Sequence, residues 1–393
     1  MRSAPLLALL AAGTLGVTGT ARATTKTWVD RPPDEARVQR VFARLTLREK
    51  VGQLLLAYPQ ISRDGPVEVG GVLFVGNTLR KLQQAKERIA SSKQRARIPP
   101  FFAVDIEGGN FNRLSRHPAL KHLPGAQELA AMDDAEVEAW GVKVGGAMRD
   151  VGLNMNLSPV FDVAGSGHMF RNGRSFSGDR AVVEKKATAF ARGLARAGVV
   201  AIGKHYPGYG DVDADSDHEA ATVDWSEARV REEASTFLPA RKWLGGVMMS
   251  NVVYTTFGPK PAILEPALVS MAHEQGWITV TDDVAIRALA EQIGQTREDV
   301  VRLAFLAGND LILTTEPPDW DGGLDYFGIL TRAAESDPLL AQQLDAACLR
   351  VLRLKDRMGL LDAVDPARAG GGVTSEATVP AGAKAPADSP AAH

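Results

Sequence analysis

The sequence is short of cysteine, and this limits the kinds of protein it can encode. Cys348 is the only cysteine among 393 residues, so an intrachain disulfide is impossible. Small secreted scaffolds that depend on disulfides are therefore excluded. Cys348 lies in the apolar pattern "LDAACLRVLRL", and we expect it to be a small buried hydrophobic side chain.

The sequence also lacks an excess of charge of either sign. Lys and Arg number 45, Asp and Glu number 47, and the formal net charge is −2. Removal of residues 1–23, with Arg2 and Arg22, would make it −4. A mildly acidic surface gives no electrostatic reason to bind nucleic acid or an anionic bilayer, so neither partner is expected.

Long apolar runs are scarce, and the one at the start of the chain is typical of a signal peptide. Residues 1–23 combine a basic Arg2, an apolar stretch and the small-x-small ending Ala21-Arg22-Ala23. Gly, Thr and Ser interrupt the stretch well short of the about 20 residues that span a membrane, so a membrane anchor is the weaker interpretation. The pattern predicts cleavage after Ala23 and a periplasmic or secreted protein. No cysteine follows this cleavage site, so a lipid anchor at the new N-terminus is not expected.

Residues 24–366 are long enough for one large α/β domain, whereas 367–393 are rich in Ala, Gly, Pro and Ser and are predicted to be disordered. Helices are predicted over 38–45 and, with Thr296 as N-cap, over 296–308. Seven apolar runs are predicted to be strands, and an eighth strand is predicted near Leu54–Ala57. The seven runs cover 70–77, 99–109, 152–163, 198–208, 245–253, 277–283 and 309–316.

Near-continuous apolar strands that alternate with helices predict a parallel sheet covered on both faces. Polar residues follow these runs where each predicted strand ends, and a single-domain (β/α)8 TIM-like barrel would bring such ends together at one mouth. An open doubly wound sheet would more often carry a Gly-rich phosphate loop, and none is seen. The polar residues at the strand ends are Asp105, Asp162, Lys204, His205, Asn251, Asp282 and Asp283.

Seven short motifs occur in an order that is similar to glycoside hydrolase family 3. They are "LTLREKVGQLL", "GGVLF", "AVDIEGG", "LNMNLSPVFDV", "RSFSGD", "KHYPGYGD" and "VTDD". The order resembles that of the single-domain β-N-acetylglucosaminidases of this family, which act on cell-wall muropeptides. The resemblance runs from about Leu45 to residue 362 and implies a retaining glycosidase that needs no cofactor or metal.

The resemblance implies roles for several of the strand-end residues. Asp282, in the "TD" strand end, matches the family's nucleophile, and the acidic pair after "WITVT" independently favours one carboxylate in the mouth. Asp283 is expected to point elsewhere or to cap the next helix. Glu107 is expected to brace its neighbours, while Gly108 and Gly109 shape the turn. The residues that match the family's sugar-binding positions are Asp105, Arg174, Lys204 and His205.

The stretch 204–219, "KHYPGYGDVDADSDHE", holds five acidic residues and two histidines that cannot build a core. In the branch that it resembles, a loop histidine oriented by an aspartate is the general acid/base. A one-residue insertion assigns these roles to His218 and Asp215. Without a gap, Asp217 occupies the place of the histidine and could itself be the acid.

Other positions in the mouth also depart from the family's pattern. Tyr209 stands in place of a histidine, Asn110 in place of an arginine, and Ser250-Asn251 in place of "AH". These departures put the usual substrate, and catalysis itself, in question.

The leading hypothesis is an exported, monomeric, retaining β-N-acetylhexosaminidase that acts on a carbohydrate substrate, either peptidoglycan or chitin-like fragments. A sugar-binding protein without activity is one alternative, and a β-glucosidase or β-xylosidase is another. The last alternative is a metal-dependent hydrolase that uses His205, Asp211, Asp213 and His218, although transition metals prefer more convergent His or Cys ligands.

Overall fold

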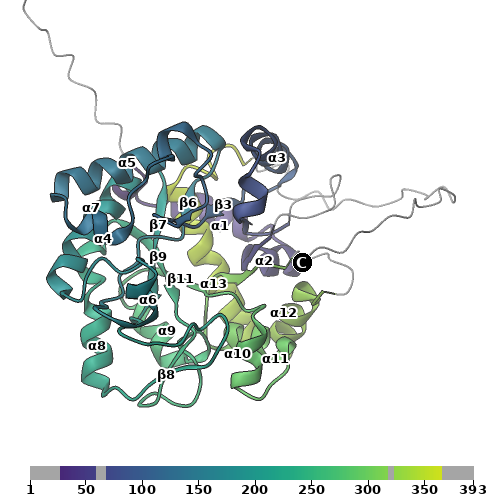
Figure 1. The fold of residues 1–393 in the computed structure, drawn as a ribbon. Helices are drawn as coiled ribbons and strands as arrows, with labels where there is room; N and C mark the ends of the chain where they lie inside the picture. The colour runs from purple at the N-terminus through teal and green to yellow at the C-terminus, as the bar shows by residue number, and fades with distance from the viewer. Residues whose placement is uncertain (1–26, 59–67, 317–322, 365–393) are drawn as a thin grey trace, which may run out of the picture.

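Eight parallel strands form the centre of the computed structural model, which describes residues 27–58, 68–316 and 323–364 (Figure 1). The predicted signal peptide 1–23 and tail 367–393 lie outside the described residues. All eight predicted strands are found at the expected places. Their bounds are β1 (Leu55–Ala57), β2 (Gly71–Phe74), β3 (Phe101–Val104), β6 (Met155–Asn156), β7 (Val200–Tyr206), β9 (Leu244–Met249), β11 (Ile278–Thr281) and β12 (Ile312–Thr314).

The strands close into a barrel. Hydrogen-bonded neighbours follow the order β11-β9-β7-β6-β3-β2-β1-β12, and every pair is parallel. A parallel bridge between Val280 and Leu311 joins the two outermost strands, and the backbone N–H of Leu311 donates to the carbonyl of Thr279. The predicted (β/α)8 barrel is confirmed.

Helices surround the barrel, as the alternation in the sequence predicts (Figure 1). Thr296 caps α11 as expected, because its hydroxyl accepts from the Asp299 N–H at 3.1 Å. The α-helices of the described part are α1 (Glu35–Phe42), α2 (Leu47–Gln53), α3 (Leu82–Arg95), α4 (Ala126–Ala130), α5 (Asp134–Val151), α6 (Gly167–Arg171), α7 (Arg180–Arg196), α8 (Glu227–Ser235), α9 (Pro266–His273), α10 (Arg287–Gln292), α11 (Arg297–Leu306), α12 (Tyr326–Glu335) and α13 (Pro338–Arg357).

Two apolar layers stabilise this arrangement. One fills the barrel with inward side chains such as Leu73, Met155 and Val280, and the other lies between the strands and the helices. Cys348 lies on α13 in the outer layer and is fully buried, as predicted. Its burial raises the pKa of the thiol to about 12, so it stays protonated and behaves as a hydrophobic side chain.

Two small sheets rise from the carboxyl ends of the barrel strands. β4 (Ile106–Gly108) pairs with β5 (Phe111–Asn112), and β8 (Ala221–Val223) pairs with β10 (Val252–Tyr254). Gly108 ends β4 with φ +115°, and a Cβ there would lie 2.2 Å from the carbonyl oxygen of Pro124, so the turn requires glycine. These sheets build up the rim where the polar residues gather.

No helix of the described part is both long and apolar enough to cross a membrane.

Candidate active site

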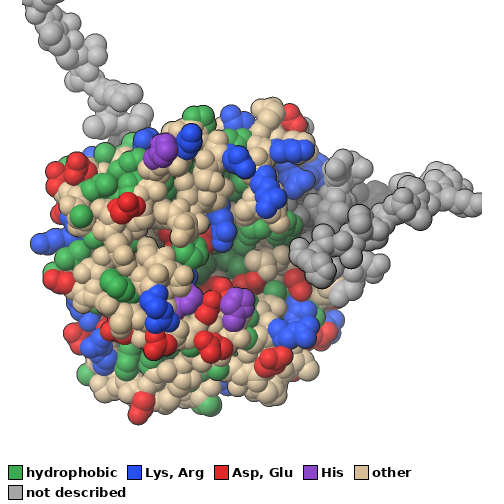
Figure 2. Space-filling model, in the orientation of Figure 1, with side chains coloured by type: hydrophobic (Ala, Val, Ile, Leu, Met, Phe, Trp, Pro, Cys, Tyr) green, Lys and Arg blue, Asp and Glu red, His purple; other side chains and the backbone are tan. Residues whose placement is uncertain are grey.

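The residues predicted for the site line one cavity of about 340 Å³ at the carboxyl ends of the barrel strands. Figure 2 shows this mouth as a hollow between a region with Lys and Arg side chains and a region with acidic side chains and histidines. The predicted residues that line the cavity are Asp105, Arg174, Lys204, His205, Asp215, His218 and Asp282. The structure brings all of them together, while their individual roles stay predictions.

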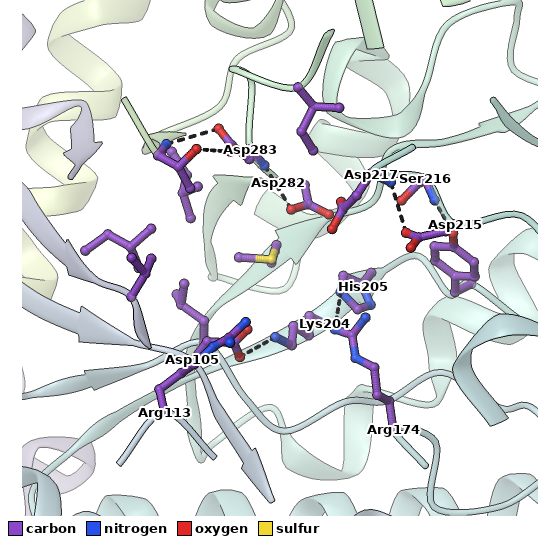
Figure 3. Close-up of a pocket in the computed structure, with 18 of the residues that line it drawn as sticks. Asp105, Arg113, Arg174, Lys204, His205, Asp215, Ser216, Asp217, Asp282 and Asp283 are labelled. Carbon is purple, nitrogen blue, oxygen red and sulfur yellow. Dashed lines mark hydrogen bonds and ion pairs between the residues drawn. The ribbon is translucent and has the colours of Figure 1, made fainter. Parts of the chain in front are cut away.

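One wall of the cavity is a buried network of charges. Lys204 extends from β7 and places its Nζ 2.6 Å from Asp105 Oδ1 (Figure 3). The same Nζ lies 2.6 Å from Glu107 Oε1. Arg174 donates to both oxygens of Glu107, at 2.8 and 2.7 Å. Its guanidinium also stacks on Phe111, 4.7 Å from the ring centroid. Glu107 therefore braces the two cations, as expected from its place beside Asp105.

The network keeps its charges despite burial. Burial opposes ionisation of Glu107, but the Arg174 guanidinium and the Lys204 ammonium hold its pKa far below the usual range. The carboxylates of Asp105 and Glu107 likewise outweigh burial and raise the pKa of Lys204. Removing either partner would leave an uncompensated buried charge, so this wall is fixed in both charge and geometry.

His205 is held by a carboxylate below the cavity. Asp162 Oδ2 lies 2.7 Å from His205 Nδ1, and Asp162 Oδ1 accepts from the backbone N–H of His205 at 3.1 Å. Arg174 Nη2 lies 3.4 Å from His205 Nε2, and a guanidinium can only donate. A carboxylate can only accept, so His205 Nδ1 carries a proton, and Asp162 fixes the orientation of the ring.

Asp282 follows β11 and faces the cavity, and the neighbouring Asp283 carboxylate is held by several hydrogen bonds. Among the described residues, the Oδ1 of Asp282 accepts only from the Asp283 N–H, at 2.9 Å. The Asp283 carboxylate accepts from the backbone N–H of Ala285 at 2.9 Å and from the N–H and hydroxyl of Thr315. Asp283 thus joins the ends of β11 and β12 through Thr315, and its side chain also lines the cavity.

The Asp282 carboxyl is half-buried and lies beside a second acid. Burial, and then the negative charge of Asp217, raise the pKa of Asp282 to about 6, while His205 and Lys204 act in the opposite direction. Figure 3 shows the carboxyl groups of Asp282 and Asp217 pointing toward each other. A carboxylate that is desolvated yet ionised at neutral pH suits a nucleophile.

The second wall is the loop from Tyr209 to Glu219. The Asp215 Oδ1 accepts from the Asp217 N–H at 3.1 Å, and Asp215 Oδ2 lies 3.9 Å from His218 Nε2. The predicted pair Asp215–His218 is thus close, but the His218 side chain is 83% exposed.

Three ionisable residues that line the cavity had no role predicted from the sequence. His168, on α6, places its Nε2 3.9 Å from Asp215 Oδ1, and Arg113 lines the cavity from the turn after β5. Tyr209 was singled out only as a departure, yet its hydroxyl accepts from the Ser216 N–H at 2.9 Å and donates to the Ala214 carbonyl at 2.7 Å. Arg113 lies close after the "EGG" motif and could have been found there, whereas nothing in the sequence signals His168.

The other departures from the family pattern lie near the mouth. Ser250 and Asn251 are buried directly after β9, and the Ser250 hydroxyl lies 3.0 Å from the Tyr254 hydroxyl. Asn110 is exposed in the turn between β4 and β5. None of the three lines the cavity.

The four residues considered for a metal site do not converge. The Asp211 Oδ1 accepts from the backbone N–H groups of Gly165 and Ser166, each at 2.8 Å, and Asp213 pairs with Arg171. Within the ranges that the structure describes, no three His, Cys, Asp or Glu side chains are arranged to hold an ion. The residues present therefore do not fit a metal centre.

Comparison with known proteins connects this geometry to a family. Residues 46–354 match the model of the glycosyl hydrolase family 3 N terminal domain. A β-hexosaminidase from Bordetella parapertussis is 31% identical over 274 residues, which cover 65% of this chain and 74% of the relative. A β-hexosaminidase from Idiomarina loihiensis is 29% identical over 254 residues, which cover 62% of this chain and 76% of the relative.

Solved structures agree with this match. A β-N-acetylhexosaminidase from Beutenbergia cavernae matches with a TM-score of 0.69 at 27% identity. The matched region covers 78% of this chain and 98% of the chain of that structure. A family 3 β-N-acetylglucosaminidase from Paenibacillus sp. str. FPU-7 matches with a TM-score of 0.70 at 28% identity. The matched region covers 86% of this chain and 66% of the chain of that structure. The resemblance seen in the motifs is confirmed: this chain belongs to glycoside hydrolase family 3 and is a glycoside hydrolase.

Proposed function

We propose that this chain is a retaining β-N-acetylhexosaminidase that removes terminal β-linked N-acetylglucosamine from peptidoglycan or chitin-like fragments. The observation that carries the proposal is the position of Asp282. It is a half-buried carboxyl directly after β11, and it faces a second acid in a cavity whose other wall is the network of Lys204, Glu107 and Arg174. The names of the relatives support the choice of sugar, because they are β-hexosaminidases or N-acetylglucosaminidases.

The proposed reaction has two steps. The Asp282 carboxylate attacks the anomeric carbon, a proton from the loop 209–219 reaches the leaving oxygen, and a covalent glycosyl-enzyme forms. Water then releases the sugar with its original anomeric configuration. Asp105 accepts hydrogen bonds from sugar hydroxyls while Lys204 and Arg174 donate them, and this mixture suits a neutral polyol.

Turnover of p-nitrophenyl N-acetyl-β-glucosaminide tests the function, and mass spectrometry with a 5-fluoro glycosyl probe tests the mechanism. We expect turnover that is lost in Asp282→Asn, a label on the peptide that contains Asp282, and a β-anomer as the first product by NMR. Sugar binding without turnover would instead indicate a binding protein without activity. Turnover of β-glucosides or β-xylosides in preference would reassign the substrate.

Export is part of the same proposal and is tested separately. The leader 1–23 supports a periplasmic or secreted location. We expect the mature chain to begin after Ala23, as N-terminal sequencing of fractionated cells can show. A chain that keeps residues 1–23 in the cytoplasmic fraction would contradict it.

A further inference from the structure

The acidic residues of the loop 209–219 differ in what their carboxylates contact. Asp211 accepts from two backbone N–H groups beside α6, and Asp213 pairs with Arg171. Asp215 accepts from the Asp217 N–H, and Glu219 Oε1 accepts from the Asp215 N–H at 3.3 Å. Each of these four therefore organises the loop or ties it to the barrel.

Asp217 is the exception in this group. Its carboxylate makes no hydrogen bond or ion pair with any residue that the structure describes, although it lines the cavity. Figure 3 shows it pointing toward Asp282, whose pKa its charge raises. Retaining glycosidases usually act through a pair of carboxyl groups that flank the glycosidic bond.

His218, the alternative donor, faces a different group. Its Nε2 is 3.9 Å from Asp215 Oδ2, and most of its side chain is in solvent. An imidazole in that position is held only weakly, because a contact of 3.9 Å is longer than a hydrogen bond.

Tyr209 explains why the loop presents Asp217. Its side chain is buried, and its hydroxyl binds both Ala214 and Ser216, the residue that precedes Asp217. Its backbone N–H donates to Asp162 Oδ1 at 2.8 Å, the same carboxylate that holds His205. Burial raises the pKa of Tyr209 to about 12, so the hydroxyl keeps the proton it donates. The loop tip is therefore fixed relative to the sugar-binding wall.

We infer that Asp217, rather than His218, is the general acid/base of this enzyme, and that Tyr209 is the residue that positions it. The inference rests on the proposed function. In the first step the Asp217 carboxyl gives its proton to the glycosidic oxygen as the bond from C1 to that oxygen breaks and the bond from Asp282 to C1 forms. The aglycone leaves as an alcohol. In the second step the Asp217 carboxylate takes a proton from water, whose oxygen bonds to C1 as the bond to Asp282 breaks.

Chemical rescue tests the inference. Asp217→Asn and His218→Gln are compared on a substrate with a good leaving group, p-nitrophenol, and on chitobiose, whose leaving group needs a proton. We expect Asp217→Asn to lose about 10²–10⁴-fold in kcat/KM on chitobiose and far less on the aryl substrate. Sodium azide should restore aryl turnover in Asp217→Asn and give the β-glycosyl azide, because azide needs no base. Asp213→Asn is the matched control and should behave as the unaltered enzyme.

The outcomes separate the inference from the function. If His218→Gln shows this pattern and Asp217→Asn does not, or if neither shows it, the assignment is overturned while the function stands. If the unaltered enzyme turns over neither substrate, the proposed function fails first and the inference with it. Asp217 is exposed, so its substitution should leave the melting temperature unchanged.

Tyr209→Phe tests the positioning role. It removes the hydroxyl but keeps the buried ring, so we expect kcat on chitobiose to fall about tenfold with little change in KM. Aryl turnover should stay nearly constant, which a general loss of structure would not allow. Equal losses on both substrates would contradict the role.

Discussion

The two walls of the cavity are built on different physical principles. On the barrel wall, Lys204 and Glu107 are 2% and 3% exposed and hold each other at 2.6 Å. On the loop wall the groups are mostly exposed, and Asp217 has no partner among the described residues. Under the proposed function, the barrel wall binds the sugar and the loop wall supplies the proton. Binding and proton transfer would then belong to separate parts of the chain.

The most severe test of this comparison removes the group that lies between the walls. Asp282→Asn should lower kcat by about 10⁴-fold or more, because no other carboxylate can form the ester. Asp283→Asn is the matched control, since that carboxylate contacts Thr315 and Ala285, and it should retain most activity. Equal losses in both variants would mean that substitution at 282 lowers activity by disturbing the site and not by removing a nucleophile.

Glu107→Gln should damage stability more than any substitution on the loop wall. It leaves Lys204 and Arg174 buried without their shared carboxylate, which costs about 3–5 kcal/mol in the free energy of unfolding. Urea denaturation measures this. Glu227→Gln breaks an exposed pair with Arg231 and should cost less than about 1 kcal/mol. A small effect at Glu107 would show that the barrel wall is not held by these charges.

Asp105→Asn should weaken substrate binding while leaving the reaction itself largely intact. A hydrogen bond to a charged group contributes about 1.5–3 kcal/mol, which corresponds to about 10–100-fold in KM. Steady-state kinetics separate this from a change in kcat. A loss confined to kcat would mean that Asp105 takes part in the reaction step. The barrel wall would then do more than bind the sugar.

The pH dependence of kcat/KM should reflect the ionisation of Asp282. The nucleophile must be ionised, and its pKa is raised to about 6, so kcat/KM should fall about tenfold per pH unit below 6. Asp217 raises this pKa while His205 and Lys204 lower it. Asp217→Asn should therefore move the acidic limb to lower pH. A limb that does not move would mean that the two carboxyl groups do not interact.

Asp213→Asn should have the smallest effect. The side chain is 84% exposed and pairs with an exposed Arg171, so the loss in stability should be less than about 1 kcal/mol. Thermal melts and aryl turnover should both resemble those of the unaltered protein. A large loss would show that the loop wall depends on its ties to α6 more than its exposure indicates.

The same two walls differ in how far the sequence could predict them. Strand ends of a parallel barrel must meet at one mouth, so Asp105, Lys204 and Asp282 could be placed together from the apolar pattern alone. The side-chain directions in the loop could not be predicted in this way, because the loop has no regular secondary structure whose period would fix them. Whether Asp217 or His218 faces Asp282 depends on hydrogen bonds to the Tyr209 hydroxyl, which sequence spacing does not reveal.

Contacts between distant segments were also beyond the sequence. His168 approaches Asp215 from α6, 47 positions earlier in the chain, and neither residue type nor spacing marks the pair. Glu107 was expected to brace its neighbours, but its bond to Arg174 could only be seen in the folded chain.

The ties between the loop and α6 have a consequence for protein engineering. Asp211 holds Gly165 and Ser166, Asp213 pairs with Arg171, and the His168 N–H donates to the Val212 carbonyl at 2.7 Å. Residues 165–171 and 209–219 are thus one exchangeable unit made of two chain segments. A chimera that grafts a relative's loop alone would inherit mismatched anchors, whereas transplanting both segments, together with the residue at 209, would carry its own scaffold.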